Sequence, residues 1–160
     1  MRFTQIDKIV ALEPGSRITA VKALSLGEEY LRDHFPLFPV MPGVLMLEAM
    51  YQAGMWLVHR SEDFAHSMVV LKQARNIKYA DFVEPGRTLT ITAEITSQDE
   101  TETLLKARGV VEGREKPAVM GRMVIERYNL ADRRPEMAPI DMHARTELRN
   151  IFNRLSDLPQ

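Results

Sequence analysis

Residues 34–52 read HFPLFPVMPGVLMLEAMYQ, and this stretch decides the fold. It begins as a loop, because Pro36 and Pro39 cannot sit inside a helix and each pushes the preceding residue toward extended geometry. Pro42 differs, since a residue without an amide donor suits the first turn of a helix, and a helical pattern continues to about Arg60. The stretch therefore predicts a loop that carries a histidine, followed by a long apolar helix that carries a carboxylate.

The helix predicted after Pro42 is apolar on nearly every side, as expected when other elements surround a helix. Glu48 interrupts these apolar residues, and an ionisable group in such surroundings must be paired, protonated or used in chemistry. A lone buried glutamate is most often paired with an arginine, for which Arg32 and Arg75 are candidates. A lone histidine before a proline loop is most often a surface or capping residue, so His34 and Glu48 taken singly indicate no function.

Beyond the helix, apolar and polar residues alternate as they do in half-buried strands. Segment 88–96 alternates most cleanly. Its apolar face comprises Leu89, Ile91, Ala93 and Ile95. Segments 103–111 and 118–128 have the same character, and turn-like residues 112–117 separate them. These three segments predict an antiparallel meander.

Other segments give weaker signals. Residues 16–26 favour a strand, and residues 28–33 favour a helical turn. Residues 68–71 form a short apolar run typical of a buried strand, whereas 75–83 is mixed and ends at a Pro-Gly turn over 84–86. One long early helix followed by several antiparallel strands predicts an α+β fold in which a curved antiparallel sheet wraps around the helix.

The C-terminal part differs in character. Residues 131–140 contain two prolines and predict a linker. Residues 144–158 predict an amphipathic helix that packs on the body or on a partner. Its apolar stripe comprises Leu148, Ile151, Phe152 and Leu155. We therefore expect one folded domain over residues 1–130, with the linker and helix of residues 131–160 packed on it.

Composition limits the classes of function. A chain of 160 residues suits a single domain, and a net charge of -1 gives no overall attraction to nucleic acid or to an anionic membrane. The absence of cysteine excludes disulfides, thiolate metal sites and cysteine nucleophiles, and it agrees with a reducing, cytoplasmic location. The longest apolar run, residues 42–58, contains Glu48 and predicts a buried helix rather than a membrane span. No metal-ligand cluster or phosphate-binding glycine loop is visible, so we expect no cofactor.

Residues 34–52 resemble the 3-hydroxyacyl-acyl-carrier-protein dehydratases of the FabZ and FabA type. That family's pattern is His-Phe-Pro-Gly-x-Pro, a hydrophobic residue, x-Pro-Gly-Val-Leu, an acidic residue, and then Ala-Met-x-Gln. A second, weaker similarity covers residues 74–89, within which residues 82–86 resemble the family's strand and Pro-Gly turn. The residues that match in register are His34, Phe35, Pro36, Pro39, Val40, Pro42, Gly43, Val44, Leu45, Glu48, Ala49, Met50 and Gln52.

The resemblance implies a hotdog fold, in which a long helix is wrapped by a curved antiparallel sheet. It also implies an acyl-carrier-protein-linked 3-hydroxyacyl substrate and a homodimer, or a hexamer built as a trimer of dimers. In the family, the histidine and the acid of one site come from opposite protomers. The members need no cofactor for dehydration.

The same resemblance assigns chemical roles. Dehydration removes a proton from C2 and hydroxide from C3, so His34 suits the base and Glu48 the group that protonates the leaving hydroxyl. Burial among apolar neighbours favours the protonated carboxyl that this role requires. Gly43 and Val44 lie at the helix N-terminus, where unpaired backbone N–H groups can hold the thioester carbonyl. Gln52 lies four residues after Glu48, on the same helix face, and is expected to orient its carboxyl group.

Several residues depart from the family pattern. Asp33 stands where the family usually has glycine, and Leu37 replaces the glycine after His-Phe-Pro, with Phe38 following it. These bulky residues are expected to narrow the acyl pocket. The candidate acyl-tunnel residues are Leu37, Phe38, Met46 and Met50.

Three readings remain open from the sequence. The first is the dehydratase, the second is a hotdog thioesterase or hydratase, and the third is a non-catalytic acyl-binding protein of the same fold. The basic residues Lys72, Arg75 and Lys78 predict a solvated strand edge, with a docking patch for an acidic carrier protein as the alternative.

Overall fold

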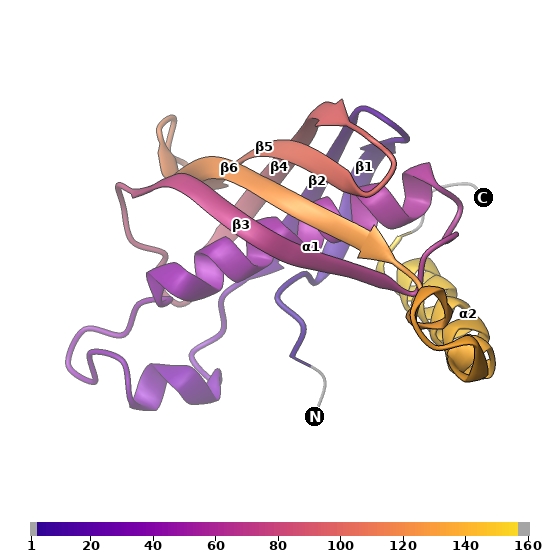
Figure 1. The fold of residues 1–160 in the computed structure, drawn as a ribbon. Coiled ribbons are helices and arrows are strands. Elements are labelled where there is room, and N and C mark those ends of the chain that lie inside the picture. The colour runs from indigo at the N-terminus through magenta and orange to yellow at the C-terminus, as the bar shows by residue number, and fades with distance from the viewer. Residues whose placement is uncertain (1–2, 157–160) are drawn as a thin grey trace.

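A six-stranded antiparallel sheet lies over one long helix, α1, in the computed structural model, which describes residues 3–156 (Figure 1). The strand order across the sheet is β1-β2-β4-β5-β6-β3. The elements in chain order are β1 (Lys8–Glu13), β2 (Arg17–Ala23), the 3₁₀ turn η1 (Glu29–Arg32), α1 (Gly43–Ser61), β3 (Met68–Tyr79), β4 (Thr88–Gln98), β5 (Glu102–Val111), β6 (Pro117–Tyr128), the 3₁₀ turns η2 (Leu130–Asp132) and η3 (Pro135–Met137), and α2 (Ala138–Leu155). The predicted α+β class is confirmed.

Helix α1 begins as the prolines predict. Pro42 is its N-cap residue, with φ −55° and ψ 138°, and its carbonyl accepts from the Leu45 N–H at 2.9 Å. Ala49, Met50 and Ala53 have no exposed surface, and the helix contacts β2, β3, β4, β5 and β6. The prediction of a helix surrounded by the sheet is therefore confirmed.

The meander of β4, β5 and β6 is also confirmed, and each strand begins or ends within one or two residues of its predicted bounds. Leu89, Ile91 and Ala93 are fully buried, while the residues between them face away from the helix. β1 was not predicted as a strand; it pairs with β2, and a register shift between Ile9 and Ala11 obscures its alternation.

β3 corrects the sequence-based prediction. Instead of a short strand over 68–71 followed by a mixed segment, one strand of 12 residues runs to Tyr79 and pairs with β6 along its length. Two register shifts, between Leu71 and Gln73 and between Arg75 and Lys78, break the alternation. A bulge moves the following side chains to the opposite face, which explains why residues 72–79 show no clean period.

The C-terminal segment is more ordered than a linker followed by a helix. Two 3₁₀ turns occupy most of 130–137, and α2 begins at Ala138 rather than near residue 144; residues 157–160 of the prediction lie outside the described part. Phe152 packs against Trp56 and Phe64, with ring centroids 6.1 and 5.7 Å away. No helix among residues 3–156 is long and apolar enough to cross a membrane.

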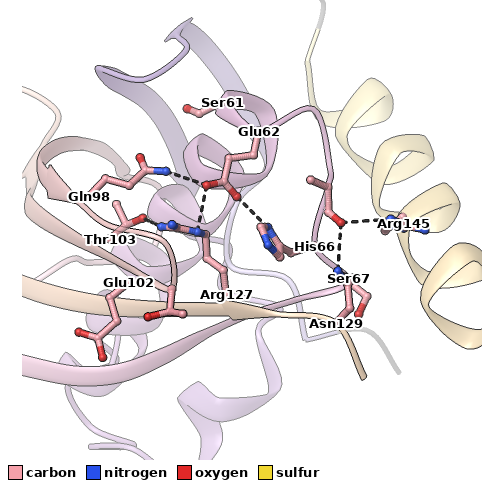
Figure 2. Close-up of polar contacts among 12 residues, drawn as sticks. Ser61, Glu62, His66, Ser67, Gln98, Glu102, Thr103, Arg127, Asn129 and Arg145 are labelled. Carbon is pink, nitrogen blue, oxygen red and sulfur yellow. Dashed lines mark hydrogen bonds and ion pairs between the residues drawn. The ribbon is translucent and has the colours of Figure 1, made fainter. Parts of the chain in front are cut away.

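A buried polar cluster fixes the end of α1 that is opposite Pro42 (Figure 2). The guanidinium of Arg127, only 2% exposed, places Nε 2.9 Å from Glu62 Oε1 and also donates to Thr103 Oγ1. Gln98 Nε2 donates to the same Glu62 oxygen at 2.6 Å, and His66 Nδ1 lies 2.9 Å from the other one. The cluster therefore joins the end of α1 to β4, β5 and β6.

Candidate active site

The histidine loop connects η1 to α1. Phe35 adopts φ 49°, a left-handed conformation that is uncommon for a residue with a side chain. A turn follows, in which the Phe38 N–H donates to the Phe35 carbonyl at 2.8 Å. The far end of the loop is fixed because the Met41 N–H donates to the Val83 carbonyl at 2.9 Å. His34 is half-buried, with its ring centroid 4.4 Å from that of Phe35.

Large apolar side chains are exposed around this loop. Leu37 is 102% exposed, which means that it touches almost nothing. Phe38 and Phe82 are about half exposed and pack edge to face, with centroids 5.7 Å apart. We call the following residues the loop patch: Phe35, Leu37, Phe38, Val44 and Phe82. Exposed apolar side chains around one loop are typical of a contact site for another molecule.

The N-terminus of α1 lies beneath an aromatic ring. A Cβ atom at Gly43 would lie 3.1 and 3.2 Å from Cδ1 and Cε1 of Tyr79, on β3. Only glycine therefore lets the first turn approach the ring without displacing it. Val44, the next residue, is 68% exposed, so this helix end is open on one side. The Gly43 and Val44 amides, which precede the Leu45 N–H bonded to the Pro42 carbonyl, can donate to an oxygen ligand.

Glu48 and Gln52 form the centre of the site. Gln52 Nε2 donates to Glu48 Oε1 at 2.8 Å and to the Phe3 carbonyl at 3.0 Å, while its Oε1 accepts from the Gln5 N–H at 2.7 Å. Both amide hydrogens and the carbonyl oxygen of Gln52 are therefore engaged. Because an N–H can only donate, the Gln5 backbone determines which end of the Gln52 amide faces Glu48.

Within the described part of the chain, the Glu48 carboxyl has no arginine partner. Among residues 3–156 no ion pair involves Glu48, and the Arg75 Nε donates to Gln73 Oε1 instead. Neither Arg75 nor Arg32 therefore fills the pairing role that the sequence left open. The carboxyl is half-buried, and burial together with the Glu48 charge raises the pKa of neighbouring Tyr51 to about 12. The Tyr51 hydroxyl donates to the Val69 carbonyl at 2.8 Å.

The remaining predicted site residues lie on different elements. No hydrogen bond or ion pair joins His34 to Glu48 in the described part of the molecule. Met46 and Met50 are 2% and 0% exposed and lie in the core, whereas Leu37 and Phe38 belong to the loop patch. The four candidate tunnel residues thus occupy two different environments.

Sequence reasoning missed two components of the site. One is the pair of backbone groups from Phe3 and Gln5 that holds Gln52, which no side-chain pattern signals. The other is the Tyr79 ring over Gly43, which lies in the segment whose strand character the bulges hid.

Comparisons with known proteins show the family of the chain. A family model described as a FabA-like domain matches residues 1–120. The 3-hydroxyacyl-acyl-carrier-protein dehydratase FabZ of Ruminiclostridium cellulolyticum is 36% identical over 124 residues, which cover 78% of this chain and 82% of the relative. The FabZ of Pelotomaculum thermopropionicum is 38% identical over 107 residues, which cover 67% of this chain and 75% of the relative.

Solved structures show the same fold. The dehydratase heterocomplex ApeI:P from Xenorhabdus doucetiae superposes with a TM-score of 0.62 at 19% identity, covering 80% of this chain and 85% of that chain. The protein smu.793 from Streptococcus mutans, bound to acetyl CoA, gives a TM-score of 0.62 at 16% identity, covering 81% and 93%. The predicted hotdog fold is thus confirmed. The chain belongs to the FabA-like family, among the FabZ-type 3-hydroxyacyl-acyl-carrier-protein dehydratases that it matches over most of its length.

Proposed function

We propose that this protein dehydrates 3-hydroxyacyl thioesters linked to acyl carrier protein, giving trans-2-enoyl thioesters for fatty-acid or related lipid biosynthesis. The observation that carries the proposal is the Glu48 carboxyl on the helix that follows the His34 loop, which Gln52 holds and which pairs with no arginine among residues 3–156. A carboxyl without a counter-ion can take up and give a proton, whereas one bound to a guanidinium is held ionised.

The reaction needs two proton transfers. The neutral imidazole of His34 takes the C2 proton, and the electron pair of that C–H bond becomes the C2–C3 double bond. The C3–O bond breaks, and the Glu48 carboxyl gives its proton to the departing hydroxyl, which leaves as water. Since Glu48 Oε1 accepts the Gln52 N–H, Oε2 is the oxygen left to give the proton.

The N-terminus of α1 suits the thioester carbonyl. Negative charge grows on that oxygen as the C2 proton leaves, and the unpaired amides of Gly43 and Val44 can donate to it. The Tyr79 ring packs where a Gly43 side chain would lie, so the carbonyl would approach these amides from the exposed side, next to Val44.

The proposal includes a homodimer with shared sites. In one chain the His34 loop makes no hydrogen bond or ion pair with Glu48 among the described residues, and the loop patch leaves five large apolar side chains exposed. A second copy seated on the loop patch would bury these side chains and supply the missing histidine. The finer assembly, such as a trimer of dimers, rests on the family resemblance alone.

One assay distinguishes the proposal from its alternatives. The purified protein is incubated with a 3-hydroxyacyl thioester while enoyl absorbance and free thiol are recorded together. We expect enoyl product with no thiol release. Thiol release would identify a thioesterase instead, and neither product at saturating enzyme would favour a non-catalytic acyl-binding protein.

A further inference from the structure

A basic hollow lies on the face of the sheet that α1 does not cover. Figure 1 shows α1 on one side of the sheet and α2 beyond the end of the sheet. Neither helix crosses the opposite face, which we call the outer face. Strands β3, β4, β5 and β6 form a hollow of about 410 Å³ on that face, which we call the outer hollow. Its charged lining residues are Lys78, Glu94, Lys106, Arg108 and Arg122.

The strand register places like charges side by side. Lys106 on β5 lies directly opposite Arg122 on β6, and Arg122 lies directly opposite Arg75 on β3. In the adjacent row, Met120 separates Arg108 from Lys78. Like charges directly opposite each other destabilise an antiparallel pair, so this arrangement destabilises the sheet when no ligand is bound.

The basic side chains of the outer hollow form no ion pair with the described residues. Glu94, the acidic residue among those that line it, lies opposite Lys106 on one side and Arg17 on the other. Among residues 3–156, no ion pair or side-chain hydrogen bond involves Lys78, Lys106, Arg108 or Arg122.

Several basic residues outside the outer hollow are paired. Lys72, also on β3, contacts both Glu102 and Glu126, and Arg114 is paired with Asp81. The lining of the outer hollow has four basic side chains and one acidic side chain, in a chain whose net charge is -1.

The shape of the outer hollow comes from a bulge. Between Arg75 and Lys78 the register shifts, and Asn76 takes φ 53°. β6 meets the bulge with Gly121, where a Cβ atom would lie 2.3 Å from Ile77 Cδ1. Bulge and glycine together let β3 press close to β6, and a bulge bends its strand and increases the local twist. Asn76 also lines the outer hollow, as do the apolar residues Pro117 and Met120.

We propose that the outer hollow binds a phosphorylated small molecule that carries a diphosphate or two neighbouring phosphates. Adjacent strands lie about 4.8 Å apart and alternate residues about 6.7 Å apart, a spacing that lets neighbouring cations grip successive phosphates. Arginine forks bind phosphate oxygens in pairs. The volume exceeds that of a lone phosphate and falls within the range of small-molecule sites, with Met120 as an apolar contact for the organic part. The sheet separates this ligand from Glu48.

Calorimetric titration with inorganic diphosphate at about 150 mM salt tests the proposal. We expect saturable binding to the wild type, with affinity about tenfold or more lower in Lys106→Gln/Arg122→Gln, because charge-assisted bonds are lost. The control, Arg87→Gln/Arg154→Gln, removes the same charge from exposed positions outside the outer hollow and should bind within about twofold of the wild type. Absence of binding to the wild type, or equal losses in the two double variants, would overturn the proposal.

A melting experiment distinguishes loss of the binding site from misfolding of the double variant. Without ligand and at low salt, Lys106→Gln/Arg122→Gln should melt at or above the wild-type temperature, because it removes directly opposed like charges. Diphosphate should raise the melting temperature of the wild type and the control but not of the double variant. If diphosphate raises none of them while an acidic carrier protein binds through these same residues, the face serves a protein and the small-ligand proposal is wrong. Neither measurement depends on dehydratase turnover.

Discussion

Gln52 Nε2 lies 2.8 Å from Glu48 Oε1, one helical turn away on α1, and the Gln52 amide cannot turn over because its oxygen accepts the Gln5 N–H at 2.7 Å. The orientation of the proposed acid is therefore set by a chain of contacts that begins in the N-terminal segment. An acid placed in this way needs no reorganisation when the substrate arrives.

A substitution that removes one backbone N–H donor can break this chain of contacts. Gln5→Pro removes the N–H that holds Gln52, whereas Gln5→Ala keeps it and serves as the matched control. We expect kcat to fall by up to about 100-fold in Gln5→Pro relative to Gln5→Ala, because the carboxyl loses its fixed position, with a smaller change in KM. Equal kcat values in the two variants would show that Gln52 holds its orientation without the N-terminal segment. Steady-state kinetics and thermal melts are measured on both.

The two proposed proton-transfer groups should be separately essential. His34→Ala and Glu48→Gln should each lower the single-turnover rate by about 10²–10⁴-fold, the contribution of a positioned acid or base. Both residues are half-buried, so the melting temperatures should remain close to that of the wild type. A variant that keeps a near-wild-type rate would remove its residue from the mechanism.

Shared sites make a prediction about mixtures. After subunit exchange, His34→Ala and Glu48→Gln protomers should form heterodimers in which one of the two sites has both groups intact. The mixture should regain activity that neither variant has alone, and tagged subunits followed by native mass spectrometry verify the exchange. If verified heterodimers remain inactive, or if the active species sediments as a monomer, each chain must build its site alone.

Leu37 should limit the acyl chains that the protein accepts. It is 102% exposed in the single chain and lies three residues from the proposed base, within the loop patch. Leu37→Gly should increase kcat/KM for longer acyl chains relative to short ones, because a bulky side chain at the edge of the site is removed. The readout is competition between 3-hydroxyacyl thioesters of increasing length. An unchanged preference would place the Leu37 side chain in the subunit contact and outside the acyl pocket.

His59 predicts a loss of stability in acid. Burial, followed by the charge of nearby His66, lowers the pKa of His59 from 6.5 to about 4. The unfolded chain therefore binds a proton more readily, and stability present above pH 6.5 is lost as the pH falls toward 4, by roughly 3 kcal/mol in all.

Urea unfolding between pH 7 and 4 measures this loss, and His59→Phe is the control. The His59 ring stacks on Phe64, with centroids 5.6 Å apart and planes 13° apart, so a phenyl ring can take its place. His59→Phe should show a smaller drop in the free energy of unfolding over the same range. Identical pH profiles would assign the acid sensitivity to other groups.

The sequence predicted those features that a local pattern encodes. Prolines marked the loop and the start of α1, and clean alternation marked β4, β5 and β6. It failed where the backbone departs from a regular period. Each bulge in β3 moves the following side chains to the opposite face of the sheet, so that residues 72–79 resemble a mixed segment in the sequence.

The candidate site likewise has a part that the sequence predicts and a part that it does not. The four-residue spacing of Glu48 and Gln52 is visible in the sequence because it follows from helix geometry. The partners of Gln52 are main-chain groups of Phe3 and Gln5, about 50 residues away, and every residue type offers such groups. The position of the Tyr79 ring over Gly43 depends on the bulged path of β3 and was equally hidden.

The buried carboxylate of Asp141 has a consequence for how the protein unfolds. It accepts from the Leu130 and Ala131 amides at 3.0 and 2.8 Å and bonds the Ser67 hydroxyl, so α2 is tied to the start of β3 and to the exit from β6. The family model ends at residue 120. Detaching α2 would nevertheless leave these donors without hydrogen-bond acceptors and expose the Trp56 and Phe64 rings to solvent. We therefore expect the C-terminal extension to melt with the hotdog body in one cooperative transition, as part of a single foldon.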